Sequence, residues 1–223
     1  MRKWTIRLGY LLAAAILLIG VLHLPMARPL LALAGACPVG RASASDIEDA
    51  RRIALRSLRG EGKAPARPAL GFDLEQTTLD DVQVWARARA IGCDLSREST
   101  LLVCRSVPAA ALHATTQETI DEAAFVFRLR DRRLINVATL TSGAAANAAA
   151  DSFAANAASL AASLGAPETR RVPRPGWDGA GPIFVRYRYA DYIADVSAMR
   201  LPGRGIVMRE QYMSASESGS QED

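Results

Sequence analysis

The carboxylates near the C-terminal end of the chain are the side chains best suited to acid–base chemistry. Asp191, Asp195 and Glu210 lie in segments with strand-like alternation, and two carboxyl groups at a suitable separation can hydrolyse a glycosidic bond. Arginines are their neighbours in the sequence, so ordinary ion pairs account for them equally well. The choice between these two roles depends on strand register, which the sequence does not reveal.

Histidine and lysine add little further catalytic chemistry. Outside the N-terminal apolar segment, His113 is the only histidine and the one that a serine or cysteine nucleophile would use. No GxSxG motif accompanies it, and Lys63 lies in a connector rich in proline and glycine. The chain also lacks HExxH, CxxC, P-loop and GxGxxG patterns. We therefore predict no metal, no cofactor and no enzyme activity, with a hydrolase that uses paired carboxylates or His113 as an alternative.

Tyrosine and arginine side chains alternate between residues 183 and 213, and this is the most recognition-like feature of the sequence. Both residue types are enriched where proteins bind each other. A proline- and glycine-rich loop at 167–182 precedes them and is longer than most connections. The outer face of any antiparallel sheet shows a similar polar alternation. The candidate contact surface comprises Arg186, Arg188, Tyr192, Arg209 and Trp177.

The net charge of +4 comes from the N-terminal end of the chain. Four of the 27 basic residues precede residue 29, which leaves 23 basic and 23 acidic residues in the remainder. Binding to a nucleic-acid backbone needs a concentrated basic surface, and a balanced domain gives no support for one. We predict no nucleic-acid partner.

A segment of nineteen residues without formal charge, Leu8 to Met26, decides where the rest of the chain lies. As a helix it would reach about 28 Å, close to the thickness of the hydrocarbon core of a bilayer. Arg2, Lys3 and Arg7 precede it, and this bias keeps the N-terminus in the cytoplasm and exports the remainder. We predict a membrane-anchored protein whose domain faces the periplasm or the cell exterior.

The sequence LAGAC, which ends at Cys37, resembles the lipobox of bacterial lipoproteins. Ala34 stands where that family usually has leucine, and Pro38 follows the cysteine. Three outcomes stay open: an uncleaved signal anchor, a lipidated Cys37, and cleavage near Ala34 to Ala36.

Cys93 and Cys104 flank a polar turn that leads into an apolar run. In an oxidising compartment they form the natural pair to close a hairpin-like loop. Such a closure would stabilise the fold by about 3 kcal/mol. We predict a disulfide between them.

Three segments have the periodicity and end signals of helices. The first begins at a capping box formed by Ser45 and Glu48 and ends at Gly60, and the second begins at Thr77 or Thr78 and stops at Gly92. The third is alanine-rich and spans 144 to 164, with an apolar stripe and a second stripe of small polar residues. We expect the apolar stripe to pack on the sheet and the small polar stripe to be wetted surface.

Strand-like alternation appears at 101–107, in a hairpin over 123–141 that turns at Asp131 to Arg133, and in two or three strands between 183 and 213. The hairpin carries a basic cluster that we expect on a solvated face: Arg128, Arg130, Arg132 and Arg133.

These features predict an α+β fold with a mainly antiparallel sheet of five to seven strands and two or three helices, preceded by a membrane-spanning or signal segment. The expected parts are a signal anchor or signal peptide (1–28), a tether with Cys37 (29–43), a single extracytoplasmic domain (44–213) and a disordered acidic tail (214–223). We expect a membrane-tethered binding or accessory protein with an envelope or membrane protein as its partner. A structural subunit of a membrane complex that uses its N-terminal helix is the alternative.

Overall fold

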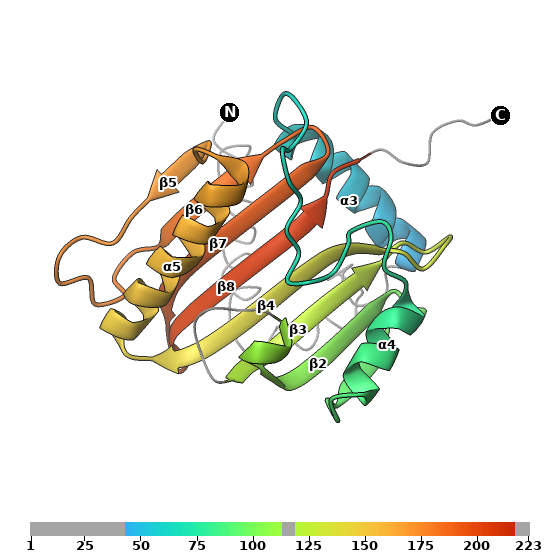
Figure 1. Cartoon of the computed structure of the whole chain (residues 1–223), viewed down its shortest axis with the longest axis horizontal. Helices are drawn as coiled ribbons and strands as arrows, with labels where there is room; N and C mark the ends of the chain where they lie inside the picture. The colour runs from blue at the N-terminus through green and yellow to red at the C-terminus, as the bar shows by residue number, and fades with distance from the viewer. Residues whose placement is uncertain (1–42, 113–118, 217–223) are drawn as a thin grey trace, which may run out of the picture. The chain divides into compact units, whose positions relative to one another are not determined.

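The computed structural model describes residues 43–112 and 119–216 of the chain. This part is an α+β domain whose strands form one antiparallel sheet of eight strands, in the order β1-β2-β3-β4-β8-β7-β6-β5 (Figure 1). The strands are β1 (Cys93–Ser96), β2 (Leu101–Pro108), β3 (Thr119–Phe127), β4 (Leu134–Ala144), β5 (Thr169–Arg171), β6 (Ile183–Arg188), β7 (Tyr192–Leu201) and β8 (Gly205–Ser214).

The α+β class and the antiparallel pairing are confirmed, but the predicted count of five to seven strands is wrong. The two edge strands account for the difference, because β1 has four residues and β5 has three. Their side chains are mostly exposed, so neither strand shows the apolar alternation by which a strand is recognised in a sequence.

Two four-stranded meanders make up the sheet. Strands β1 to β4 follow one another, β5 to β8 do the same, and β4 pairs with β8 at the centre. A helix precedes each meander, α4 (Leu79–Arg87) before β1 and α5 (Ala146–Leu164) before β5. The chain therefore builds the same order of elements twice, although its sequence shows no repeat.

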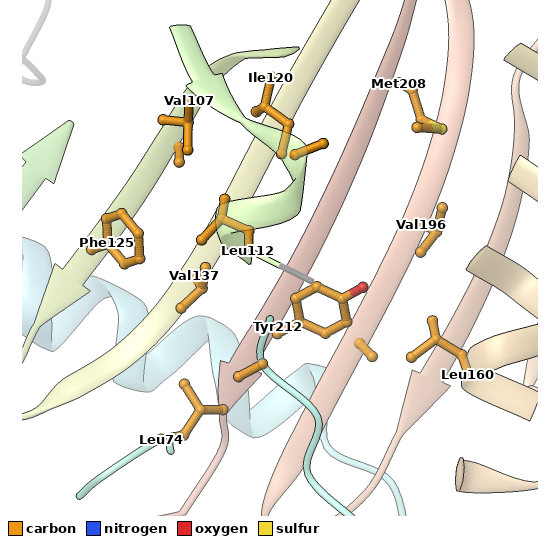
Figure 2. Packing of buried hydrophobic residues seen from close by; sticks show 14 of the residues in the cluster. Leu74, Val107, Leu112, Ile120, Phe125, Val137, Leu160, Val196, Met208 and Tyr212 are labelled. Carbon is orange, nitrogen blue, oxygen red and sulfur yellow. The ribbon is translucent and has the colours of Figure 1, made fainter. Parts of the chain in front are cut away.

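Helices α4 and α5 lie on the same face of the sheet, and the segment 59–78 crosses that face between them (Figure 1). The main hydrophobic core fills the space beneath these three elements, where Leu74, Phe125, Leu160 and Tyr212 are all buried (Figure 2). The segment 59–78 therefore acts as part of the cover of the core, although it contains little regular structure.

Helix α5 begins and ends close to the predicted positions, whereas α4 ends at Arg87, before the predicted stop at Gly92. Thr78, one of the two predicted cap residues, caps α4 and forms a capping box with Asp81. Helix α5 ends at Gly165, whose φ of +83° suits glycine. Trp85 of α4 packs edge-to-face against Phe125 with ring centroids 5.7 Å apart, which places it in the core.

Helix α3 (Ala44–Leu58) lies on the other face of the sheet, where a smaller hydrophobic cluster holds it. In this cluster Leu55 packs with Ile193 of β7 and with Ala215, which follows β8. Ser43 and Asp46 form the capping box of α3, so the predicted box of Ser45 and Glu48 is wrong. Glu48 instead accepts a hydrogen bond from the backbone N–H of Leu129, at 3.1 Å. This tertiary contact occupies the carboxylate that the sequence pattern assigned to the cap.

The hairpin of β3 and β4 is confirmed, but its turn lies at residues 129–131 and shares only Asp131 with the predicted turn of Asp131 to Arg133. The prediction of a solvated basic face is wrong for Arg128, which is only 8% exposed. Its guanidinium lies 2.9 Å from Asp131 and 3.4 Å from Glu75. Glu75 comes from the 59–78 segment, and its approach across the sheet could not be read from the hairpin alone.

The disulfide between Cys93 and Cys104 is confirmed, and it joins β1 to β2 at directly opposed positions. None of the helices in the part of the chain that the structure describes is long and apolar enough to cross a membrane. The predicted anchor at Leu8 to Met26, the lipobox-like Cys37, His113 and residues 217–223 of the predicted tail lie outside the described residues. Strand β8 extends to Ser214, and Ala215 is buried.

Candidate functional site

Glu210 is a carboxylate on the core face of the central strand β8. Alternation along β8 places it in line with Met208 and Tyr212, whose side chains belong to the hydrophobic core. It is 4% exposed. An acidic residue at such a position costs free energy unless its polar atoms are paired, so its partners are informative.

Two donors hold the Glu210 carboxylate. The amide of Asn156 on α5 donates to Oε1 at 2.5 Å, and the hydroxyl of Tyr212 donates to Oε2 at 2.8 Å. Burial raises the pKa of Glu210, while these two hydrogen bonds act in the opposite direction and favour the ionised form. Within residues 43–112 and 119–216, no basic side chain acts on this carboxylate, and both of its hydrogen-bond donors are neutral.

A pocket of about 190 Å³ opens above this carboxylate, and we call it the Glu210 pocket. Residues 68–71 form one wall, and α5 forms the other through Asn156, Leu160 and the exposed residues Ser159 and Ser163. The pocket is thus polar at its floor, apolar along part of its walls and lined with hydroxyl groups at its mouth. A small ligand could reach the carboxylate through it.

Two features of the sequence point to this site, one in strand β8 and one in helix α5. Glu210 occupies the apolar register of β8, which marks it as a buried acid once the strand is known. The small polar stripe of α5, which we expected to be wetted surface, instead contributes the buried Ser152 and Asn156 and the pocket-lining Ser159 and Ser163. Only the packing of α5 over β8 brings the two features together.

The three carboxylates considered for hydrolysis do not share a site. Asp195 pairs with Gln211 in the sheet register and therefore projects from the face opposite to Glu210, where it binds Arg186 at 3.3 Å and Arg188 at 3.1 Å. Asp191 accepts a hydrogen bond from the backbone N–H of Ala64. No two of these three carboxyl groups therefore face each other, as a two-carboxylate mechanism requires.

The candidate contact surface is divided by the fold. Arg186 and Arg209 are exposed on the face of the sheet opposite to α5, and Arg188 is partly buried in its ion pair with Asp195. Tyr192 is 0% exposed, and its hydroxyl donates to the backbone carbonyl of Pro68. Tyr192 therefore lies in the core and cannot contact a partner in this conformation.

Trp177 lines a second concave site, which we call the Trp177 pocket. It has a volume of about 310 Å³, with Ile183 at its buried end and Arg171, Arg174 and the exposed Val172 among its other walls. The indole N–H of Trp177 donates to the carbonyl of Gly181 at 3.2 Å, which fixes the ring against the loop. The loop thus presents a rigid aromatic surface beside cationic side chains.

The arginines of β5 and of the loop that follows it are not neutralised by the fold. Arg170, Arg171 and Arg174 are exposed, and no ion pair links any of them to another described residue. Arg171 and Arg174 line the Trp177 pocket, and cationic groups beside an aromatic ring suit an anionic ligand or an acidic protein surface.

Hydrogen bonds to strand β7 hold the loop in place despite its length. The backbone N–H of Arg200 donates to Gly179, and its guanidinium donates to the carbonyl of Asp178. Gly179 has a φ of +96° and lies so close to Arg200 and Ile206 that an added Cβ would come within 3.0 Å of both. Glycine is therefore required at this point for the loop to reach the sheet.

Among the described residues, no three histidine, cysteine, aspartate or glutamate side chains gather in a way that could hold a metal ion. Comparison with protein-family models, with curated proteins and with solved structures finds no match for this chain.

Proposed function

We propose that the chain is a membrane-tethered, extracytoplasmic binding protein that contacts an acidic envelope or membrane protein through the Trp177 pocket. The observation that carries this proposal is the pair of exposed arginines, Arg171 and Arg174, beside Trp177, whose loop is hydrogen-bonded to the sheet. A rigid aromatic anchor and directed cationic donors are the residue types that dominate binding energy at protein interfaces. The pocket supplies both without a conformational change.

The membrane tether and the exported location rest on the sequence of residues 8 to 26 and on the basic residues that precede it. The disulfide supports the exported location, because such bonds persist mainly in oxidising compartments. Intact mass and N-terminal sequencing of the protein from its own membranes test this part. A mass that includes residues 1–36 means a retained anchor, whereas a chain that begins at a modified Cys37 means a lipoprotein.

Site-specific cross-linking tests the contact. A photoreactive benzoylphenylalanine at Val172, which is 56% exposed, is expected to cross-link the full chain to one acidic partner in native membranes. Trp177→Ala and Arg174→Glu should each lower the yield at least about tenfold, the change typical of an interface hot spot. Arg87→Glu on the distant helix α4 makes the same charge change and should leave the yield unaltered.

Equal yields in Arg174→Glu and Arg87→Glu would contradict a contact at this pocket. A further arm replaces residues 8–26 with an unrelated spanning segment. If this exchange abolishes the adduct and Arg174→Glu does not, the alternative of a structural subunit that binds through its N-terminal helix is correct.

A further inference from the structure

The Glu210 pocket has a chemical feature that the proposed partner contact does not use. Its floor is a carboxylate whose two hydrogen-bond donors, Asn156 and Tyr212, are both neutral. Both donors point at the carboxylate oxygens, so the arrangement matches the ionised form, which can only accept hydrogen bonds. The site therefore offers a buried negative charge that no positive charge of the described residues balances.

The elements around Glu210 supply no cation. Its neighbours across the sheet are Val196 on β7 and Thr139 on β4, and neither carries a charge. The wall at residues 68–71 is uncharged, and α5 contributes Asn156, Leu160, Ser159 and Ser163. The nearest arginine in sequence to that wall, Arg67, is directed to Glu75 at 3.4 Å. The pocket itself is the remaining route by which a positive charge can reach the carboxylate.

We infer that the Glu210 pocket binds a small primary ammonium ion. The ammonium group pairs with the Glu210 carboxylate, and a short alkyl stem lies against Leu70 and Leu160 towards the mouth. Three N–H donors suit the free acceptor positions of the carboxylate and the hydroxyl oxygens of the serines on α5. The volume of about 190 Å³ is below the roughly 300–1,000 Å³ of pockets for drug-sized ligands, so the ligand has few heavy atoms.

The charge of Glu210 makes this binding depend on pH. Burial raises the pKa of Glu210, and a primary ammonium group keeps its proton up to about pH 10. Affinity should therefore increase as pH rises through the pKa of Glu210 and then stay level. Tyr212 is the other titratable group in contact with the carboxylate, and burial raises the pKa of its hydroxyl, which stays protonated over this range.

Titration of the full chain in detergent with n-butylammonium tests the proposal, with n-butanol as the neutral molecule of the same shape. We expect saturable chemical-shift changes at the residues of the pocket with butylammonium and at least tenfold weaker binding of butanol. Glu210→Gln, which keeps the side-chain shape, should weaken butylammonium binding at least tenfold and remove its pH dependence. Glu168→Gln, an exposed carboxylate outside the pocket, is the matched control and should change nothing.

A second variant keeps the test decisive if Glu210→Gln alters the fold. Ser163→Leu adds bulk at an exposed position of the mouth, leaves the core untouched and should also abolish binding. Equal affinity for butanol and butylammonium would overturn the proposal, and so would full binding in Glu210→Gln or Ser163→Leu. Failure of the wild-type chain to bind butylammonium up to about 100 mM would do the same. None of these outcomes depends on the Trp177 pocket.

Discussion

Removal of the disulfide measures how strongly the edge of the sheet is tied to the rest of the domain. Cys93 and Cys104 lie eleven positions apart, and the chain-entropy relation for a loop of this length gives about 3 kcal/mol of stabilisation. For a chain of this size, that corresponds to a fall in Tm of about 6–12 °C. Cys104 is 0% exposed in the core, so its replacement also removes packing and the loss should not be smaller than this.

The assay is urea unfolding of Cys93→Ala/Cys104→Ala, prepared in a Cys37→Ser background to prevent exchange with the third thiol. Cys37→Ser alone is the control and should unfold like the wild-type chain. Far-UV circular dichroism reports the whole fold. Tryptophan fluorescence in a Trp4→Phe/Trp177→Phe background reports the core beneath α4, where the ring of Trp85 packs on Phe72 and Phe125. A difference below about 1 kcal/mol would refute the loop-entropy argument, and a fluorescence transition that precedes the circular dichroism would show that this edge unfolds independently.

Three further changes test the core and the buried acid. Tyr192→Phe should cost about 1–2 kcal/mol, because it leaves the Pro68 carbonyl without its hydrogen bond; urea midpoints measure this, and an unchanged midpoint would mean that water replaces the hydroxyl. Phe153→Ala should cost about 3–5 kcal/mol, since this side chain of α5 is 1% exposed, and a smaller loss in the same assay would mean that α5 collapses into the cavity. Glu210→Gln should flatten the pH dependence of stability. Burial raises the pKa of Glu210 above its ordinary value of 4.5. The carboxyl group of Glu210 therefore contributes its full stabilisation of the fold below that value, and this stabilisation is lost as pH rises through the folded-state pKa. Unfolding free energies from pH 4 to 8 measure the difference between the two proteins, and parallel curves would contradict this assignment.

Local patterns were sufficient for much of the fold. The cap at Thr78 and the stop at Gly165 depend on neighbouring residues, and they lie where the sequence predicts them. The pairing of Cys93 with Cys104 follows from a short loop in the same way. The two edge strands are missing from the prediction because exposed three- and four-residue strands have no apolar face to repeat.

Long-range contacts explain the predictions that differ from the structure. Glu48 does not cap α3, because its carboxylate accepts a hydrogen bond from the backbone N–H of Leu129. Arg128 is buried because it pairs with Glu75, which comes from another part of the chain. In each case the partner is more than fifty residues away in the sequence. A local pattern has no access to such a partner, and it therefore assigns a charged side chain either to its nearest cap or to solvent.

The sequence by itself determined the class of fold, the helices of the domain, the central strands and the disulfide, because these follow from periodicity, end signals and cysteine spacing. Only the tertiary structure decided which side chains meet. It placed Tyr192 in the core and Asp195 and Glu210 on opposite faces, and it brought Asn156 of α5 to Glu210 of β8 across 54 positions of the chain. The register of a strand sets the face of each side chain, and this register is fixed only when the whole sheet and its covering helices are assembled.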